Sequence, residues 1–367
     1  MSNTIGLYLH IPFCKSKCAY CDFFSRAADE QQLDKYTAAL VHAIEKWGDT
    51  AKETVASVYF GGGTPSILGT ERLCRLLSAV KASFALADNA EITLEVNPES
   101  GLRLDFAALR QTGFNRVSMG LQSADEQELQ ILGRIHTPQQ AAQAVRAAQA
   151  AGIDNISLDL MMGIPLQTQE SLRRSIDFCL SLGVKHLSSY ILKIEQGTRF
   201  YSIKEQLQLP DEDEQAALYL FAVDYLRQNG FAQYEISNFS LSGFESRHNT
   251  LYWRCGEYIG IGAAAHSFYH GRRFYTPRSF DAFYGGEAVD DGEGGGEEET
   301  IMLALRLTEG LDFAAFEQRF GHALSPVFFQ KLRKYKQAGF MTQDDNHVCF
   351  TPKGFLVSNT ILSDLLT

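Results

Sequence analysis

The chain has 367 residues, 45% hydrophobic and 21% charged, with a formal net charge of −11. This composition supplies a sizeable core and excludes a disordered chain, and the acidic excess argues against nonspecific binding of nucleic acid, which depends on clustered Lys and Arg. No apolar run approaches the roughly 20 residues of a membrane span, and the first residues lack the basic flank and cleavage site of a secretory signal, so we expect a cytoplasmic protein.

Six short runs rich in Val, Ile, Leu, Tyr or Phe predict strands in the first two hundred residues. They cover 5–10, 55–60, 92–96, 116–121, 156–160 and 187–192. Apolar residues at helical spacing lie between them, as along 36–47, 73–84 and 172–180. Strand and helix in alternation predict parallel strands joined by crossover helices. Because six units are too few for a closed eight-stranded barrel, the pattern fits either an open (β/α)6 barrel or a doubly wound sheet.

The alternation weakens after residue 192. An amphipathic helix is expected over 211–228, followed by an aromatic, Gly-rich stretch over 231–284. The segment 285–299 holds seven acids, six glycines and no base. Such a composition cannot bury a core, so it predicts a flexible linker or exposed loop.

The last 68 residues predict three helices, a hairpin around 341–350 and a final helix, which is typical of a winged-helix module or of a small helical cap. We therefore expect a barrel core followed by a smaller, winged-helix-like domain. The proposed divisions are 1–200 for the (β/α)6 barrel core, 201–284 for a barrel-flanking region, 285–299 for the acidic linker and 300–367 for the C-terminal domain.

Three of the seven cysteines lie within eight residues. Cys14, Cys18 and Cys21 form a CxxxCxxC motif directly after the first predicted strand. Three thiolates on one loop can bind three irons of a cubic cluster, which leaves the fourth iron open to a substrate or cofactor. A structural zinc site is the alternative, but it usually needs four ligands, and no second cysteine pair accompanies this loop.

Glycines and polar residues follow the other predicted strands, where a parallel α/β barrel gathers its functional groups. The candidates are Gly62, Gly63 and Thr64 in GGGTP, Glu95 in LEVNP, Gln122 in GLQS and Asp159 in SLDL. The glycines allow a close approach to a ligand and leave backbone N–H and C=O groups free to bind it. Asp159 is costly to bury unless it is paired, and Arg134, after a short helix, can bind a carboxylate in bidentate fashion.

These motifs together resemble the radical S-adenosylmethionine superfamily, and within it the branch of the oxygen-independent coproporphyrinogen III oxidases. The resemblance covers roughly residues 7–192. It implies a [4Fe-4S] cluster held by the three cysteines, with S-adenosylmethionine on the open iron. It also implies a tyrosine beside the cluster, a second aromatic whose main chain meets the adenine, and strand-end contacts to S-adenosylmethionine. In this sequence these residues are Tyr8, Tyr20, Gly62, Gly63, Thr64, Glu95, Gln122, Arg134 and Asp159.

Two departures bear on the activity within that branch. The oxidases have a fourth cysteine two residues after the third, where this chain has Phe23, and they carry a longer N-terminal extension. The string HNTLYW at 248–253 resembles instead the motif of the haem chaperones of the same branch. An imidazole can ligate haem iron, so the resemblance implies haem binding by His248, Tyr252 and Trp253. A core His beside packed aromatics is the alternative, and His266 is a weaker candidate ligand.

The sequence therefore predicts a haem chaperone that holds a [4Fe-4S] cluster with S-adenosylmethionine, binds haem and passes it to apo-proteins such as respiratory enzymes. An oxygen-independent coproporphyrinogen III oxidase is the alternative. A radical enzyme acting on tRNA is disfavoured by the acidic chain, and we expect no nucleic-acid partner. The sequence leaves open a homodimer and a peripheral contact with the inner membrane.

Overall fold

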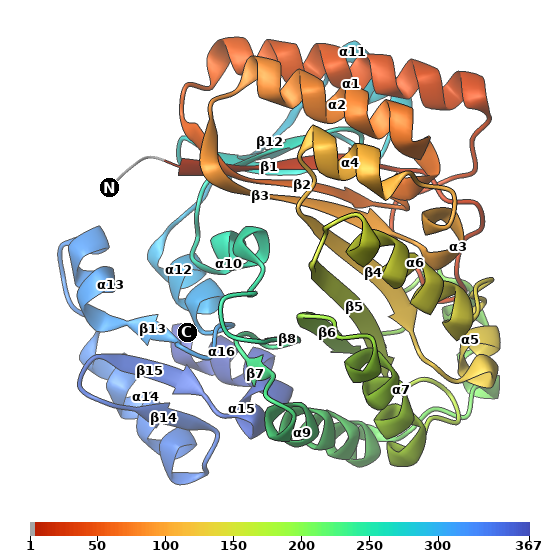
Figure 1. The fold of residues 1–367 in the computed structure, drawn as a ribbon. Coiled ribbons are helices and arrows are strands. Elements are labelled where there is room, and N and C mark those ends of the chain that lie inside the picture. Colours follow the sequence, from red (N-terminus) through yellow and green to blue (C-terminus); the bar gives the residue numbers. More distant parts are fainter. Residues whose placement is uncertain (1–3) are drawn as a thin grey trace.

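The computed structural model describes residues 4–367, which build one twelve-stranded sheet and a small three-stranded sheet (Figure 1). Six parallel strands form the centre of the large sheet: β1 (Thr4–Ile11), β2 (Thr54–Gly62), β3 (Leu86–Val96), β4 (Arg116–Gln122), β5 (Asn155–Met162) and β6 (His186–Ile191). Each pairs with the next in chain order. A doubly wound sheet would reverse that order at a switch point, so the structure confirms the open barrel-type arrangement.

Helices follow the strands and cover the outer side of the sheet (Figure 1). They are α1 (Glu30–Thr50), η1 (Pro65–Leu68), α2 (Gly69–Ser83), α3 (Pro98–Gly101), α4 (Phe106–Thr112), α5 (Glu126–Leu132), α6 (Pro138–Ala150) and α7 (Gln169–Ser181). Asp29, Thr137 and Thr168 open α1, α6 and α7 with capping boxes, which satisfy N–H groups at the helix start. Apolar stripes such as Leu40 and Ile44 are fully buried against the sheet.

The middle of the chain extends the sheet on both sides. Its elements are α8 (Arg199–Ser202), η2 (Lys204–Gln206), α9 (Glu212–Gln228), β7 (Ala232–Gln233), β8 (Asn238–Ser240), α10 (Arg247–Trp253), β9 (Tyr258–Ile261), β10 (His266–Tyr269), β11 (Arg272–Tyr275) and α11 (Phe280–Gly285). Strand β8 pairs with β6, and β9 runs parallel to β1. The helix predicted over 211–228 is confirmed as α9, with Asp211 as its N-cap.

The acidic segment 285–299 is part of the fold, so the prediction of a flexible linker is wrong. It contains β12 (Val289–Glu293), which pairs with β11 at the edge of the large sheet, and the start of α12 (Glu297–Ala304). Arginines of β11 pair with two of its seven acids: Arg272 pairs with Asp290, and Arg273 Nη2 lies 2.5 Å from Glu299 Oε1. An exposed edge strand needs no apolar side chains of its own, because its neighbour supplies the hydrogen bonds.

The C-terminal elements are β13 (Leu311–Asp312), α13 (Phe313–Phe320), α14 (Pro326–Gln337), β14 (Met341–Gln343), β15 (His347–Phe350), α15 (Pro352–Leu356) and α16 (Ser358–Leu366). The hairpin predicted around 341–350 is β14–β15, and β13 pairs with β15. This small sheet lies beside helices, and two helices follow the hairpin where one is predicted. Within residues 4–367, no helix has both the length and the apolarity to cross a membrane.

Candidate functional site

A cavity of about 340 Å³ lies at the C-terminal ends of the parallel strands. Eleven of the residues predicted to hold a cluster or cofactor line it: Cys14, Cys18, Tyr20, Cys21, Gly62, Gly63, Thr64, Glu95, Gln122, Arg134 and Asp159. Tyr8 does not line the cavity. Its ring stacks on that of Tyr59, and its hydroxyl lies 3.0 Å from His10 Nδ1. Residues spread over almost 150 positions of the chain therefore meet in one place.

The cysteine loop is held by backbone hydrogen bonds on both sides. Cys14 N–H donates to the Arg26 carbonyl over 3.0 Å, and Ala19 N–H donates to the Leu132 carbonyl at the end of α5 over 3.2 Å. All seven cysteines are free thiols, and burial raises the pKa of Cys21. Three free thiols on the wall of one cavity fit a cluster with three protein ligands.

The glycine turn after β2 packs directly on the cysteine loop. Gly62 has a φ of +114°, and a Cβ on Gly63 would lie 2.6 Å from the Phe13 carbonyl oxygen. The N–H groups of Gly63 and Thr64 donate to the carbonyls of Ile11 and Phe13 over 2.9 and 2.8 Å. The prediction that these N–H groups are free for a ligand is therefore wrong, because they join the turn to the loop.

Two buried carboxylates face the cavity. Glu95 accepts hydrogen bonds from the Tyr59 hydroxyl over 2.7 Å and from Gly62 N–H over 3.2 Å, and burial raises its pKa to about 7. Asp159 accepts from the Ser118 hydroxyl over 3.1 Å, and its pKa is also raised by burial. The guanidinium of Arg116, only 1% exposed, acts in the opposite direction on both carboxylates. The cavity therefore combines two buried carboxylates whose pKa values are raised by burial with a buried guanidinium.

A chain of hydrogen bonds links two of the three cysteines. Cys14 Sγ lies 3.3 Å from Thr64 Oγ1, which accepts from Asn97 Nδ2 over 3.1 Å. Asn97 Oδ1 accepts from Arg134 Nη2 over 2.9 Å, and Arg134 Nη1 lies 3.5 Å from Cys18 Sγ. Arg134 is thus bound to the cysteine loop, to Asn97 just after β3 and to the Gly120 carbonyl of β4, and is not a surface arginine.

Several cavity residues were not predicted from the sequence. These are Tyr59, Asn97, Arg116, Ser118 and Tyr190, whose hydroxyl donates to Gln122 Oε1 over 3.0 Å. Asn97 stands two residues after Glu95 in the same strand-end motif, which is a signal that could have found it. The other residues contact partners on strands that are distant in the sequence, so no local sequence pattern identifies them as cavity residues.

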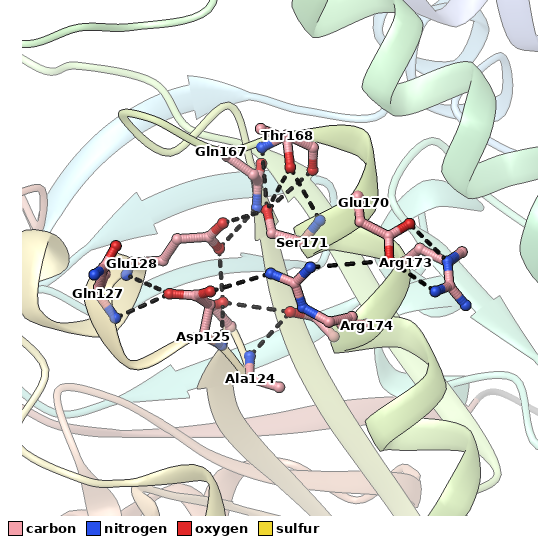
Figure 2. Close-up of polar contacts among 12 residues, drawn as sticks. Ala124, Asp125, Gln127, Glu128, Gln167, Thr168, Glu170, Ser171, Arg173 and Arg174 are labelled. Atoms are coloured by element: carbon pink, nitrogen blue, oxygen red, sulfur yellow. Dashed lines mark hydrogen bonds and ion pairs between the residues drawn. The ribbon is translucent and has the colours of Figure 1, made fainter.

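A polar network joins α5 to the residues at the start of α7, as Figure 2 shows. Glu128 is 4% exposed and accepts from the hydroxyls of Ser171 and Ser123 over 2.5 and 2.6 Å, and from Gln167 Nε2 over 3.3 Å. Asp125 caps the start of α5 and forms an ion pair with Arg174 over 3.3 Å. The end of α5 binds the cysteine loop through the Leu132 carbonyl. The network that holds α5 therefore also supports the cysteine loop.

The HNTLYW string forms α10, and its histidine is buried. His248 is 1% exposed, with Nδ1 2.8 Å from Ser57 Oγ and Nε2 2.7 Å from the Tyr252 hydroxyl. Burial, with Arg116 nearby, lowers its pKa to about 3. Neither ring nitrogen is free to bind iron in this structure, and Tyr252 is engaged by His248. In this structure His248 and Tyr252 bond to each other, and haem ligation by His248, Tyr252 and Trp253 stays a prediction.

Comparison with known proteins gives the family. Residues 8–179 match the radical SAM superfamily, and residues 298–357 match the HemN C-terminal domain. "Heme chaperone HemW" of Bacillus subtilis is 33% identical over 98% of both chains, and that of Escherichia coli is 35% identical over 98% of this chain and 97% of its own. The Escherichia coli coproporphyrinogen III oxidase HemN has the same fold, with a TM-score of 0.83 at 21% identity over 99% of this chain and 90% of its own. The radical SAM superfamily implies a [4Fe-4S] cluster and S-adenosylmethionine, which the cavity fits. The chain belongs to the HemW family within the radical SAM superfamily.

Proposed function

We propose that this protein is a haem chaperone, which binds haem and delivers it to apo-proteins such as respiratory enzymes. The observation that carries the proposal is the identity of 32–35% with proteins named heme chaperone, over 98% of this chain. The proposal places the protein in the cytoplasm, with haem and haem-requiring apo-proteins as its partners. Size-exclusion chromatography and flotation with inner-membrane vesicles would show whether it also forms a homodimer or binds the membrane surface.

In this proposal Cys14, Cys18 and Cys21 hold the [4Fe-4S] cluster, which when bound supplies an electron to the sulfonium of S-adenosylmethionine. The remaining cavity residues orient that cofactor. Tyr20, Gly62, Gly63, Thr64, Glu95, Gln122, Arg134 and Asp159 are within its reach, because all line the same cavity. The carboxylates offer acceptors to ammonium and hydroxyl groups, and the chain from Cys14 to Cys18 keeps the loop in one conformation.

The alternative activity is oxidative decarboxylation of coproporphyrinogen III, because the fold of the Escherichia coli oxidase covers 99% of this chain. One side chain distinguishes the haem chaperone from the oxidase. It stands where the oxidases have their fourth cysteine. This residue is Phe23, which borders the cavity and is 60% exposed. A phenyl ring cannot replace a thiol in ligation or redox chemistry, so we favour the chaperone.

Anaerobic reconstitution with iron and sulfide, followed by two parallel assays, tests the proposal. We expect the reconstituted protein to retain haem through gel filtration and to transfer it to an apo-acceptor. We also expect coproporphyrinogen III, incubated with protein, S-adenosylmethionine and dithionite, to keep its carboxylates by mass spectrometry. Turnover of coproporphyrinogen without haem retention would establish the alternative instead. A Cys14→Ser, Cys18→Ser, Cys21→Ser variant controls for chemistry that does not depend on the cluster.

A further inference from the structure

Arg116 is a buried cation to which the protein gives no direct polar partner. Its side chain is 1% exposed. Within residues 4–367 it forms no hydrogen bond and no ion pair, and its Nε atom is buried without a partner. Because a guanidinium stays charged in proteins, such burial is costly unless an anion compensates it. Arg116 is therefore a candidate partner for an anionic ligand.

The alternation of β4 turns Arg116 into the cofactor cavity. Every second residue of this strand faces inward, and those that line the cavity with Arg116 are Ser118, Gly120 and Gln122. The Nε atom of Arg116 is enclosed, whereas the two terminal nitrogens are not, so they open onto the cavity. A ligand in the cavity can therefore reach the hydrogen-bonding edge of the guanidinium.

The two carboxylates of the cavity are bonded to other groups. Glu95 accepts from Tyr59 and from a backbone N–H, and Asp159 accepts from Ser118. Both interact with the charge of Arg116 only through space. Burial raises the pKa of Glu95 to about 7, so this carboxyl is only partly ionised near neutral pH. The acids of the cavity therefore compensate the guanidinium incompletely.

Arg116 belongs to the end of the cavity away from the cysteine loop. It begins β4, whereas Gln122 ends the strand. Six residues of a parallel strand span about 20 Å, which is longer than an arginine side chain. The arginine at the loop itself is Arg134, which bonds to Cys18 and Asn97. The two arginines thus serve different ends of one cavity.

Asn238 supplies a second unpartnered polar atom to the same cavity. It begins β8 and is 9% exposed, and its Oδ1 atom is buried without a partner. An amide oxygen accepts a hydrogen bond and gives none. Asn238 therefore fits an N–H or O–H group of a ligand, whereas Arg116 fits an anion.

We propose that Arg116 forms a carboxylate-binding subsite at the inner end of the cofactor cavity. Two N–H groups of the guanidinium donate to the two carboxylate oxygens, a geometry in which such pairs are strong. The carboxylate comes either from the methionine group of S-adenosylmethionine or from a second small ligand that shares the cavity. This subsite goes beyond the proposed haem-chaperone function and does not depend on haem binding.

Thermal unfolding of the reconstituted protein in sodium propionate tests the subsite. Sodium chloride at the same ionic strength is the reference, so that screening by salt cancels. We expect propionate to raise the Tm of the wild type and to bind Arg116→Met at least about tenfold more weakly, because the charged pair is lost. Arg103→Met is the matched control, since Arg103 is exposed and does not line the cavity. It should respond as the wild type does.

The same variant tests whether the guanidinium has a role inside the ligand-free protein. In chloride alone, Arg116→Met should melt no lower than the wild type, because removal of an unpaired buried charge leaves no group unsatisfied. Circular dichroism and the cluster absorbance show whether it is folded. A lower Tm, or failure to fold, would show that the protein itself uses the guanidinium and would overturn the subsite.

Calorimetry with S-adenosylmethionine and its decarboxylated form identifies the source of the carboxylate. If Arg116→Met weakens only the binding of S-adenosylmethionine, the carboxylate is that of the methionine group. If it affects both forms equally and also loses the propionate effect, the carboxylate belongs to a second ligand. If neither propionate nor the carboxylate of S-adenosylmethionine distinguishes Arg116→Met from the wild type, the subsite is overturned. The chaperone function would then still stand, since haem retention tests it separately.

Discussion

Replacement of Glu128 by Gln should loosen the support of the cysteine loop. Glu128 is buried in α5 and accepts from two serine hydroxyls at 2.5 and 2.6 Å. The amide oxygen of Gln can accept one of these bonds, and its NH2 group faces the other hydroxyl. The substitution thus removes one bond to a charged acceptor, and such a bond contributes about 1.5–3 kcal/mol to stability.

We therefore expect Glu128→Gln to lower the free energy of unfolding by about 2 kcal/mol, and Glu128→Ala, which removes all three bonds that the carboxylate accepts, by about 3–5 kcal/mol. Because Ala19 N–H is bound to the last carbonyl of α5, both variants should also lose their cluster faster to a chelator. Anaerobic urea unfolding and the decay of the brown absorbance measure the two effects.

Glu126→Gln is the matched control, since Glu126 is exposed on the same helix. It should change stability by no more than about 0.5 kcal/mol. A double-mutant cycle of Glu128→Gln with Ser171→Ala should show a coupling of at least about 1 kcal/mol. If Glu128→Gln matches Glu126→Gln in unfolding and in cluster loss, the support role of this network is refuted.

The other predictions concern the cluster, the cofactor and pH. Single Ser substitutions at Cys14, Cys18 or Cys21 should each abolish the cluster absorbance after reconstitution; retention in any one variant would remove that residue as a ligand. Burial raises the pKa of Glu95 to about 7, so its negative charge grows from pH 6 to 8 and the calorimetric affinity for S-adenosylmethionine should rise with it; Glu95→Gln should bind more weakly with a flat profile, and equal slopes would contradict the reasoning. Burial also raises the pKa of Glu235 to about 7 from 4.5. The pKa of Glu235 is higher in the folded state than in the unfolded state. Its contribution to the free energy of unfolding is therefore complete below pH 4.5 and is lost as the pH rises to 7, by about 3 kcal/mol in all. Glu235→Gln should reduce the difference in unfolding free energy between pH 5 and pH 8 in urea titrations, and an unchanged pH dependence would contradict this role of Glu235.

The strand pattern of the barrel was readable from the sequence because each central strand is an apolar run bounded by polar or glycine residues. The first and last residues of the strands were harder to predict. β3 begins at Leu86, six residues before its apolar run, because pairing with Val55 of β2 extends it through polar residues. The segment 285–299 was predicted to be a flexible linker for a related reason: composition does not show that arginines on β11 pair with two of its acids.

The site was predictable where the chemistry lies at strand ends, because parallel topology brings those ends together. The roles of Tyr59 and Arg116 were not predictable, since their partners lie on other strands. Haem ligation by His248 stays a prediction. In this structure its two ring nitrogens lie within hydrogen-bond distance of Ser57 on β2 and of Tyr252 one turn along α10. Only the contact with Ser57 lies outside the motif.

The acidic border strand has a consequence for self-association. Asp290, Asp291 and Glu293 point to solvent along β12, which ends the large sheet on one side. Asp290 is paired with Arg272, but a second copy that continued the sheet there would bring Asp291 and Glu293 close to their own counterparts. The strand at the opposite end of the sheet, β7, is only two residues long. The acidic side chains of β12 and the short length of β7 thus disfavour the addition of a strand from another molecule at either end of the sheet. Because acid protonates the carboxylates of β12, fibrous aggregates should form first at low pH.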